Sequence, residues 1–145
     1  MIGLYSVMVK HIKQKTINAI YEKGMILLAI MINSEYGDVS IDNNVIAQIA
    51  GMVANKCYGV VGMASRNKKD GIVSLLKGDT ISKGIKIYVE ESAIVIEMHI
   101  IVEYGVNINA ICDSIVNNVK YKVESNTGLK VKRVNVLVES VRVQE

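Results

Sequence analysis

Apolar and polar residues follow two different periods along the chain, and near its middle they predict a strand followed by a helix. Val39 and Ile41 alternate with polar neighbours, which is typical of a half-buried strand. Asp42 can cap a helix that ends at Gly59. The apolar stripe of this helix has four-residue spacing and consists of Val45, Ile49, Val53 and Cys57.

A hairpin is predicted further along the chain. Apolar and polar residues alternate from 85 to 90 and again from 94 to 102, as in strands that bury one face. The segment Glu91-Ser92-Ala93 turns the chain between them. The inward face of the second strand consists of Ile94, Ile96, Met98, Ile100 and Val102. We expect the other face of this hairpin to be solvated.

A second main helix follows the hairpin. Asn107 or Asn109 can cap its start, and Gly128 ends it. The apolar stripe of this helix consists of Ile108, Ile111, Cys112, Ile115, Val119 and Val123.

The last predicted strand changes phase near its end. Its first apolar residues, Val134, Val136 and Val138, share one face, but Val141 and Val143 are out of phase with them. One extra residue in a strand reverses the facing of every residue after it. A β-bulge near Glu139-Ser140 is therefore predicted.

Together these elements predict an α+β fold with a small mixed or antiparallel sheet. The expected order is strand, helix, strand, short helix, strand, strand, helix, strand, with the two main helices on one face. The short helix is expected near residues 72–76. The opposite face would expose apolar side chains among charged ones, which suits self-association or a partner. This candidate interaction surface consists of Lys86, Tyr88, Val95, Glu97, His99, Ile101 and Arg133.

The chain divides into a basic N-terminal extension, residues 1–35, and a domain over residues 36–145. The apolar run at 25–32 is too short to cross a bilayer, which takes about 20 apolar residues. No small-residue cleavage site follows it at 33–35, so export by a signal peptide is not expected.

Three interpretations of the extension stay open. Translation that starts at Met25 or Met31 would make the upstream segment an annotation artefact. A basic amphipathic helix that carries Ile12, Ile17 and Ile20 would rest on a membrane surface. The third interpretation is an ordinary helix or strand packed on the domain.

Composition narrows the class of protein without indicating a reaction. Half of the residues are apolar, yet Phe, Trp and Pro are absent, so the core must be aliphatic. The net charge of +3 is small and the charges are interspersed, which does not demand a polyanionic partner. Cys57 and Cys112 lie on predicted apolar helix faces without a second ligand at metal-binding spacing, so we expect buried, inert thiols in a reducing cytoplasm.

One cluster that suggests chemistry is a row of Glu97, His99 and Glu103 on one strand face. Side chains on one strand point in parallel about 7 Å apart, so they do not converge on a metal or substrate. We expect a solvated ion-pair face instead. No phosphate-binding glycine loop and no nucleophile elbow is present, and no catalytic residue, cofactor or metal is expected.

Basic residues gather in two places. One basic cluster is the loop that contains Arg66, Lys68 and Lys69, and the other runs from Lys120 to Arg133. They could follow nucleic-acid phosphates, but the exposed sheet face lacks the paired aromatic residues that stack bases, so nucleic acid is not the favoured partner. The same lysines could face anionic lipid head groups.

Two segments, YGDVSIDNNVIAQIAGMVANKCYGVVGMAS at 36–65 and GVNINAICDSIVNNVKYKVESNTGLKVKRVNVLVESVRV at 105–143, resemble the alkaline shock protein family. This family is also called the Gls-type general stress family of Gram-positive bacteria. The resemblance covers about residues 36–143, and the CYGVVGMAS run looks closest to a branch encoded beside a dihydroxyacetone-kinase-like or fatty-acid-kinase gene. The matching positions are turn glycines and core aliphatic residues, so the resemblance supplies no catalytic residue.

The resemblance implies a non-enzymatic adaptor in the envelope response to alkaline or cell-wall stress, or in lipid homeostasis. Such a protein is cytoplasmic and peripheral at the inner face of the membrane. It associates with itself, with related family members and with a membrane-anchor protein, and this branch implies a link to a fatty-acid-kinase-like protein. The alternative is a small nucleic-acid-binding module that uses residues 66–69 and the Lys120–Arg133 cluster. The long basic extension departs from the family's usual short start.

Overall fold

The computed structural model describes residues 29–65 and 81–144 of the chain. The predicted short helix near 72–76, the basic loop at 66–69 and most of the N-terminal extension lie outside the described residues. The chain separates into two units, Met1–Asn43 and Asn44–Glu145, which we describe one at a time.

The described part of the first unit is a two-stranded antiparallel hairpin. Strand β1 (Ala29–Ser34) pairs with β2 (Gly37–Asp42) in a register that sets Ile32 opposite Val39. The strand predicted around residues 39–41 is therefore confirmed as β2, but it does not join the main sheet as expected. Its partner β1 comes from the end of the predicted extension, and the predicted boundary between residues 35 and 36 falls in the hairpin turn.

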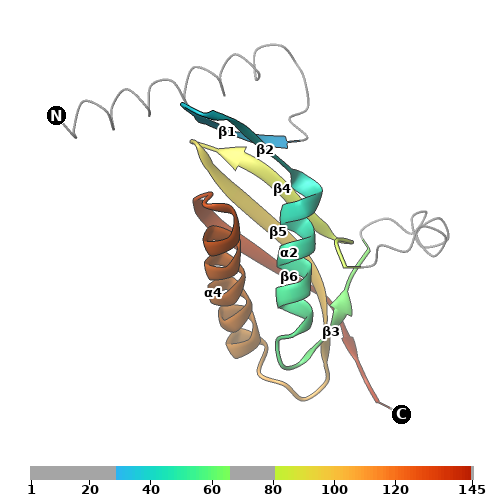
Figure 1. Ribbon diagram of the computed structural model, residues 1–145. Coiled ribbons are helices and arrows are strands. Elements are labelled where there is room, and N and C mark those ends of the chain that lie inside the picture. The colour runs from blue at the N-terminus through green and yellow to red at the C-terminus, as the bar shows by residue number, and fades with distance from the viewer. Residues whose placement is uncertain (1–28, 66–80, 145) are drawn as a thin grey trace. The chain divides into compact units, whose positions relative to one another are not determined.

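The second unit contains a mixed four-stranded sheet centred on one long strand, β5 (Ala93–Glu103) (Figure 1). Strands β4 (Ile85–Glu90) and β3 (Val60–Met63) pair antiparallel with the first and second parts of β5. Strand β6 (Val131–Arg142) runs parallel to β5 along the other edge. This confirms the predicted α+β class and makes the sheet mixed.

Local signals in the sheet behave as predicted. The turn residues Glu91 and Ser92 both have positive φ, 50° and 66°, which matches the twist that a tight hairpin turn requires. The predicted bulge in β6 is also confirmed, because Val138 pairs with Ile100 while Ser140 pairs with Ile101, leaving Glu139 as the extra residue.

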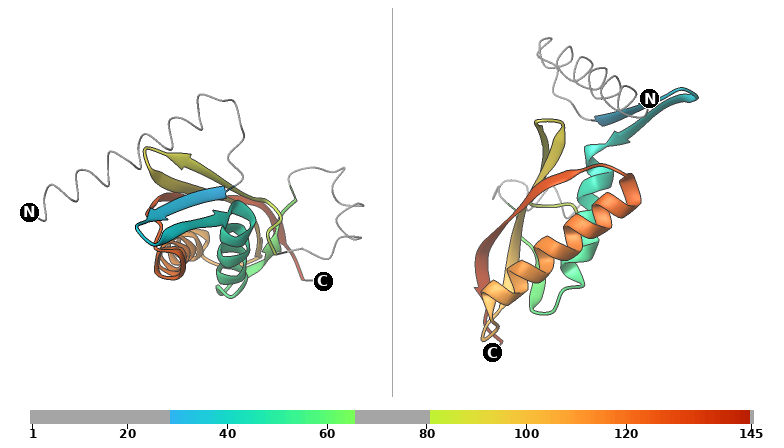
Figure 2. Two further views of the ribbon diagram at one scale, coloured as in Figure 1. Left: turned by 45° about the horizontal axis from the view of Figure 1, so that its top comes forward. Right: turned by 90° about the vertical axis from the view of Figure 1, so that its left-hand side faces the viewer.

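Two helices, α2 (Asn43–Asn55) and α4 (Ile108–Thr127), lie on the same face of the main sheet (Figure 2). The caps of α4 agree with the sequence. The Asn107 side chain accepts a hydrogen bond from the Ala110 N–H at 3.1 Å, and Gly128 has the left-handed φ of 70° that ends the helix. The predicted stripe of α4 is confirmed in its buried members, Ile111, Ile115, Val119 and Val123.

The buried face of α2 is not the one that the period predicted. The larger residues Val45, Ile49 and Val53 are only partly covered, and the buried residues are Ile46, Ala47, Ala50, Gly51 and Ala54. Small residues let a helix backbone approach its neighbours closely. A Cβ atom on Gly51 would lie 2.1 Å from the carbonyl oxygen of Ile81. Close packing therefore selects the alanine and glycine face, and the β-branched stripe of α2 points away from the core.

The core of the second unit lies between the sheet and these helices. Ile96, Met98 and Ile100 of β5 are fully buried, as the predicted inward face requires, and Ile46 of α2 and Ile115 of α4 are buried too. Aliphatic side chains thus fill the core, as the composition indicated.

Candidate interaction surfaces

The sheet face opposite the helices differs from its prediction at two central residues. Val95 is 0% exposed and His99 is 4% exposed, so neither belongs to an accessible interaction surface. Glu97 and Ile101 are half-buried. The exposed members of the predicted surface are Lys86, Tyr88 and Arg133.

Long side chains on the flanking strands lie on both sides of Val95. The register places Tyr88 of β4 on one side of Val95 and Arg133 of β6 on the other. The Arg133 guanidinium reaches across β5 to Glu90, with 2.9 Å between Nη2 and Oε2. An ion pair therefore spans the central strand beside Val95.

His99 lies between two carboxylates. Its Nε2 atom is 3.2 Å from Oε1 of Glu97, and its Nδ1 atom contacts Oε1 of Glu139. Glu97 and His99 were expected to point in parallel on a solvated face. This expectation is wrong, because the His99 ring is buried and the Glu97 side chain bends toward it. Glu139 was missed as a partner, although Leu137 pairs with His99 and the alternation of β6 puts Glu139, two residues later, on the same face.

Both ring nitrogens of His99 are thus occupied by groups of the same chain. A metal or a substrate needs a nitrogen that is free to bind it. Within residues 29–65 and 81–144, no group of three His, Cys, Asp or Glu side chains is placed to hold a metal ion. Because His99 lies on β5 and Glu139 lies at the bulge of β6, their contact links the two strands.

Part of the basic cluster at the end of α4 and the start of β6 is neutralised. Lys132 Nζ lies 2.7 Å from Oε2 of Glu91 and 3.5 Å from Oε1 of Glu90. The hydrogen bond to Glu91 raises the pKa of Lys132, and the same contact lowers the pKa of Glu91. The exposed lysines that complete the cluster are Lys120, Lys122 and Lys130.

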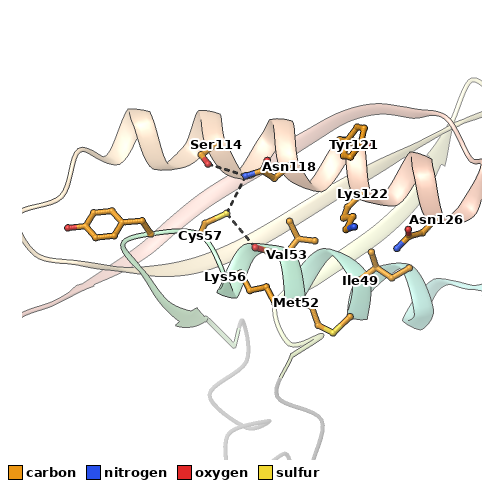
Figure 3. A pocket seen from close by; sticks show the side chains of 11 residues that line it. Ile49, Met52, Val53, Lys56, Cys57, Ser114, Asn118, Tyr121, Lys122 and Asn126 are labelled. Carbon is orange, nitrogen blue, oxygen red and sulfur yellow. Dashed lines mark hydrogen bonds between the residues drawn. The ribbon is translucent and has the colours of Figure 1, made fainter.

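A second surface lies on the outside of the helix layer, where α2 and α4 enclose an open groove of about 450 Å³ (Figure 3). Sequence reasoning did not identify it. The apolar part of the groove comes from α2 and is formed by Ile49, Met52 and Val53. The α4 side is polar and aromatic, with Ser114, Asn118, Tyr121, Lys122 and Asn126. Three members of the stripe that the period of α2 predicted, Ile49, Val53 and Cys57, thus line this groove.

The groove carries positive charge and no negative charge of its own. Lys56 comes directly after α2 and Lys122 lies on α4, and no Asp or Glu is among the lining residues. Helix α2 contains no charged residue at all. In the described part of the chain, no carboxylate lies within ion-pair distance of either lysine.

The two thiols are half-buried, not buried as predicted. Cys57 lies in the groove, where its Sγ atom donates to the Val53 carbonyl oxygen at 3.4 Å and lies 3.9 Å from the Asn118 amide nitrogen. Cys112 lies on α4, where burial, and to a lesser degree the Asp113 carboxylate, raises the pKa of its thiol.

Among the described helices, none is long and apolar enough to cross a membrane.

Comparison with known proteins places the chain in an envelope-related group. The model of the alkaline shock protein family, described as having a "cell envelope-related function", matches residues 31–143. "Uncharacterized protein YloU" of Bacillus subtilis is 42% identical over 117 residues, which is 80% of this chain and 98% of that protein. "Uncharacterized protein Spy1614" of Streptococcus pyogenes is 33% identical over 80% of this chain and 97% of that protein.

Two weaker likenesses add no function. "Uncharacterized protein YqhY" of Bacillus subtilis is 26% identical over 76% of this chain and 81% of its own length. A solved structure of a MamM CTD variant covers 70% of this chain and 94% of its own, with a TM-score of 0.36 and 15% identity.

Proposed function

The chain belongs to the alkaline shock protein family, which has a cell envelope-related function, and on this premise we propose that it is a non-enzymatic adaptor. It works by binding copies of itself and other proteins in the envelope stress response or in lipid homeostasis. It is cytoplasmic and reaches the inner face of the membrane through a separate anchor protein.

The observation that carries this proposal is the long outer edge of β6. The strand covers Val131–Arg142, and among the described strands it pairs only with β5. An unpaired edge presents backbone donors and acceptors that can pair with another chain. Leu137, near the middle of the strand, is 39% exposed, and Val141 and Val143 are exposed near its end. These features suit pairing between the β6 strands of two copies.

The polar clusters of the sheet support a binding role over a catalytic one. His99 uses both ring nitrogens within the chain, and Lys132 and Arg133 are paired with carboxylates of the hairpin. Catalytic sites keep titratable groups directed at a substrate in a concave site. These side chains are instead directed at one another.

Substitution at the edge of β6 tests the proposal. Two-fold antiparallel pairing brings residues near the middle of one β6 close to the same residues of the other. Leu137→Lys would then set like charges side by side. We expect light scattering to report an oligomer for the native chain and a monomer for this variant. Ile108→Lys is a matched control, since Ile108 is exposed to a similar degree on α4. A native chain that is monomeric at high concentration would contradict the proposal.

Nucleic-acid binding is the second candidate function, because Lys120, Lys122 and Lys130 remain exposed. Several phosphate contacts would make the affinity for a mixed RNA pool fall steeply with salt, with a slope of roughly −0.7 per phosphate neutralised on a single strand. The adaptor proposal predicts no such slope.

The same lysines would also be attracted to an anionic membrane surface, by about 1 kcal/mol for each lysine near that surface, which suits a peripheral location. The proposal also includes a fatty-acid-kinase-like protein among the binding partners of this adaptor.

A further inference from the structure

We propose that the groove between α2 and α4 binds an acidic amphipathic helix of a second protein. The inference rests on the proposed adaptor function and names the chemistry of one partner. It uses a surface that differs from the β6 edge, so the two can be tested separately.

The apolar part of the groove has the spacing that a helical partner needs. Ile49 and Val53 are one turn apart on α2, and both are half-buried although they stand outside the core. Met52 between them is 47% exposed, and an unbranched thioether adapts its shape to an incoming side chain. A helix that lies in such a groove inserts residues from one face at three- and four-residue spacing.

The charge of the groove selects the partner. Lys56 directly follows α2, Lys122 lies on α4, and both line the same groove. No carboxylate of the described residues lies within ion-pair distance of either lysine. A partner with Asp or Glu beside its apolar stripe would place opposite charges next to both lysines. A basic partner would be repelled. The groove therefore fits an apolar ridge with acidic flanks.

The dimensions and the rim also fit a helix. A groove of about 450 Å³ holds a few side chains of one ridge and not a whole helix. The 13 residues of α2 extend about 20 Å, which is enough for three to four turns of a partner. Tyr58 and Tyr121 stand on the rim at 85% and 72% exposure. Tyrosine is enriched where proteins meet, because it offers a large apolar surface and a hydroxyl.

A second copy of the chain does not offer this partner through its described helices. Helix α2 has no charged residue, and the apolar stripe of α4 is buried against its own sheet. Neither helix can present an apolar ridge flanked by acids. The described helices of a second copy therefore do not supply the occupant, and the proposal assigns it to another protein.

The test uses a synthetic fluorescein-labelled helical peptide with leucines on one face and glutamates on both flanks. Its affinity for the full chain is measured by fluorescence anisotropy, and a peptide with lysines in place of the glutamates is the control. We expect the acidic peptide to bind and the basic peptide not to bind. The double variant Lys56→Glu/Lys122→Glu should weaken the acidic peptide by tenfold or more and should gain affinity for the basic peptide, as charge complementarity requires. Lys120→Glu, on α4 but outside the groove lining, is the matched control and should change little.

The thiol of Cys57 gives an independent readout, because it lies inside the groove. In a Cys112→Ala background, saturating acidic peptide should slow alkylation of Cys57. Binding that is unaffected by Lys56→Glu/Lys122→Glu, absence of acidic-peptide binding at millimolar concentration, or an unprotected thiol would overturn the inference.

Other occupants are separate outcomes. Loss of binding to vesicles with anionic lipid in the double variant, without any peptide binding, would assign the groove to a membrane. Loss of self-association in Met52→Asp would assign it to a second copy, and either result would overturn the inference. Leu137→Lys should leave peptide binding intact. A chain that binds the peptide but never oligomerises would contradict pairing at β6 and leave the groove proposal standing. A chain that oligomerises but does not bind the peptide would contradict the groove proposal alone.

Discussion

At the scale of single residues, His99 shows how a polar side chain is accommodated in a sheet without a described helix over it. The ring is almost completely buried and has a carboxylate oxygen at each nitrogen. Each ring nitrogen therefore faces an oxygen of a group that can accept a hydrogen bond. The contact with Glu139 joins residues forty positions apart in sequence, so it fixes β6 to β5 at the bulge.

Removal of one carboxylate tests this role. Glu139→Ala leaves a buried ring nitrogen without its partner, which costs about 1–3 kcal/mol. We expect urea denaturation to show a lower free energy of unfolding with an unchanged slope. Glu103→Ala is the control, because the Glu103 carboxylate accepts a hydrogen bond from the exposed Gln144 at the end of the sheet, and its loss should stay within about 0.5 kcal/mol. Equal effects of the two substitutions would contradict a structural role for the His99 cluster.

The thiol of Cys112 provides a prediction about pH. Burial and the Asp113 carboxylate both disfavour the thiolate, so the pKa of Cys112 is raised and the thiolate forms only at higher pH. In a Cys57→Ala variant, the alkylation rate of Cys112 should rise with pH along a profile displaced above that of a free cysteine derivative. Asp113→Asn should move the profile part of the way back. A profile that coincides with the free thiol would contradict the effect of burial.

How far single residues could be predicted depends on the distance of their partners in sequence. The alternation of β5 correctly put Val95, Glu97 and His99 on the same face. Their surroundings come from the flanking strands, because Arg133 reaches Glu90 across β5 and Glu139 contacts His99 at a bulge. The bulge was visible as a phase change, but no local pattern states which side chains of β6 bend over β5.

At the scale of elements, α2 shows two apolar faces of which only one enters the core. Val45, Ile49 and Val53 form the more hydrophobic stripe, and its period correctly predicts a helix. The alanine and glycine face is buried because the helix backbone approaches Ile81 closely. Hydrophobicity alone could not rank these faces, because close packing is a property of the neighbours. The groove was missed for the same reason.

Gly51 gives the sharpest test of that close packing. In an exposed helix, glycine to alanine stabilises by about 1 kcal/mol. Here the added Cβ would meet a backbone oxygen at 2.1 Å, so the backbone must shift and Gly51→Ala should destabilise by about 1–3 kcal/mol. Gly62→Ala is the matched control, since a Cβ there meets no atom within 4 Å. Thermal denaturation of both variants measures the difference, and stabilisation by Gly51→Ala would contradict the packing of α2.

At the scale of the whole molecule, the chain combines a family-wide match with two separate structural units. The family model covers residues 31–143 and so includes most of the β1–β2 hairpin as well as the main sheet. The sequence correctly predicted the order of the described elements from β2 onward, and the short helix expected near residues 72–76 lies outside the described part of the chain. It could not predict that β2 pairs with β1 and leaves the main sheet, because the alternation of Val39 and Ile41 specifies a strand but not its partner.

The distribution of the core predicts how the two units behave when separated. The buried apolar residues of the described chain all lie between Ile46 and Val134, within the second unit. A two-stranded hairpin alone is marginal in water, whereas a sheet covered by two helices has its own core. A truncated chain of residues 42–145, which keeps the start of α2, should therefore retain one cooperative unfolding transition by circular dichroism. A peptide of residues 29–42 should show no such transition. Loss of cooperativity in the truncated chain would contradict an independent second unit, because it would mean that the core depends on residues before α2.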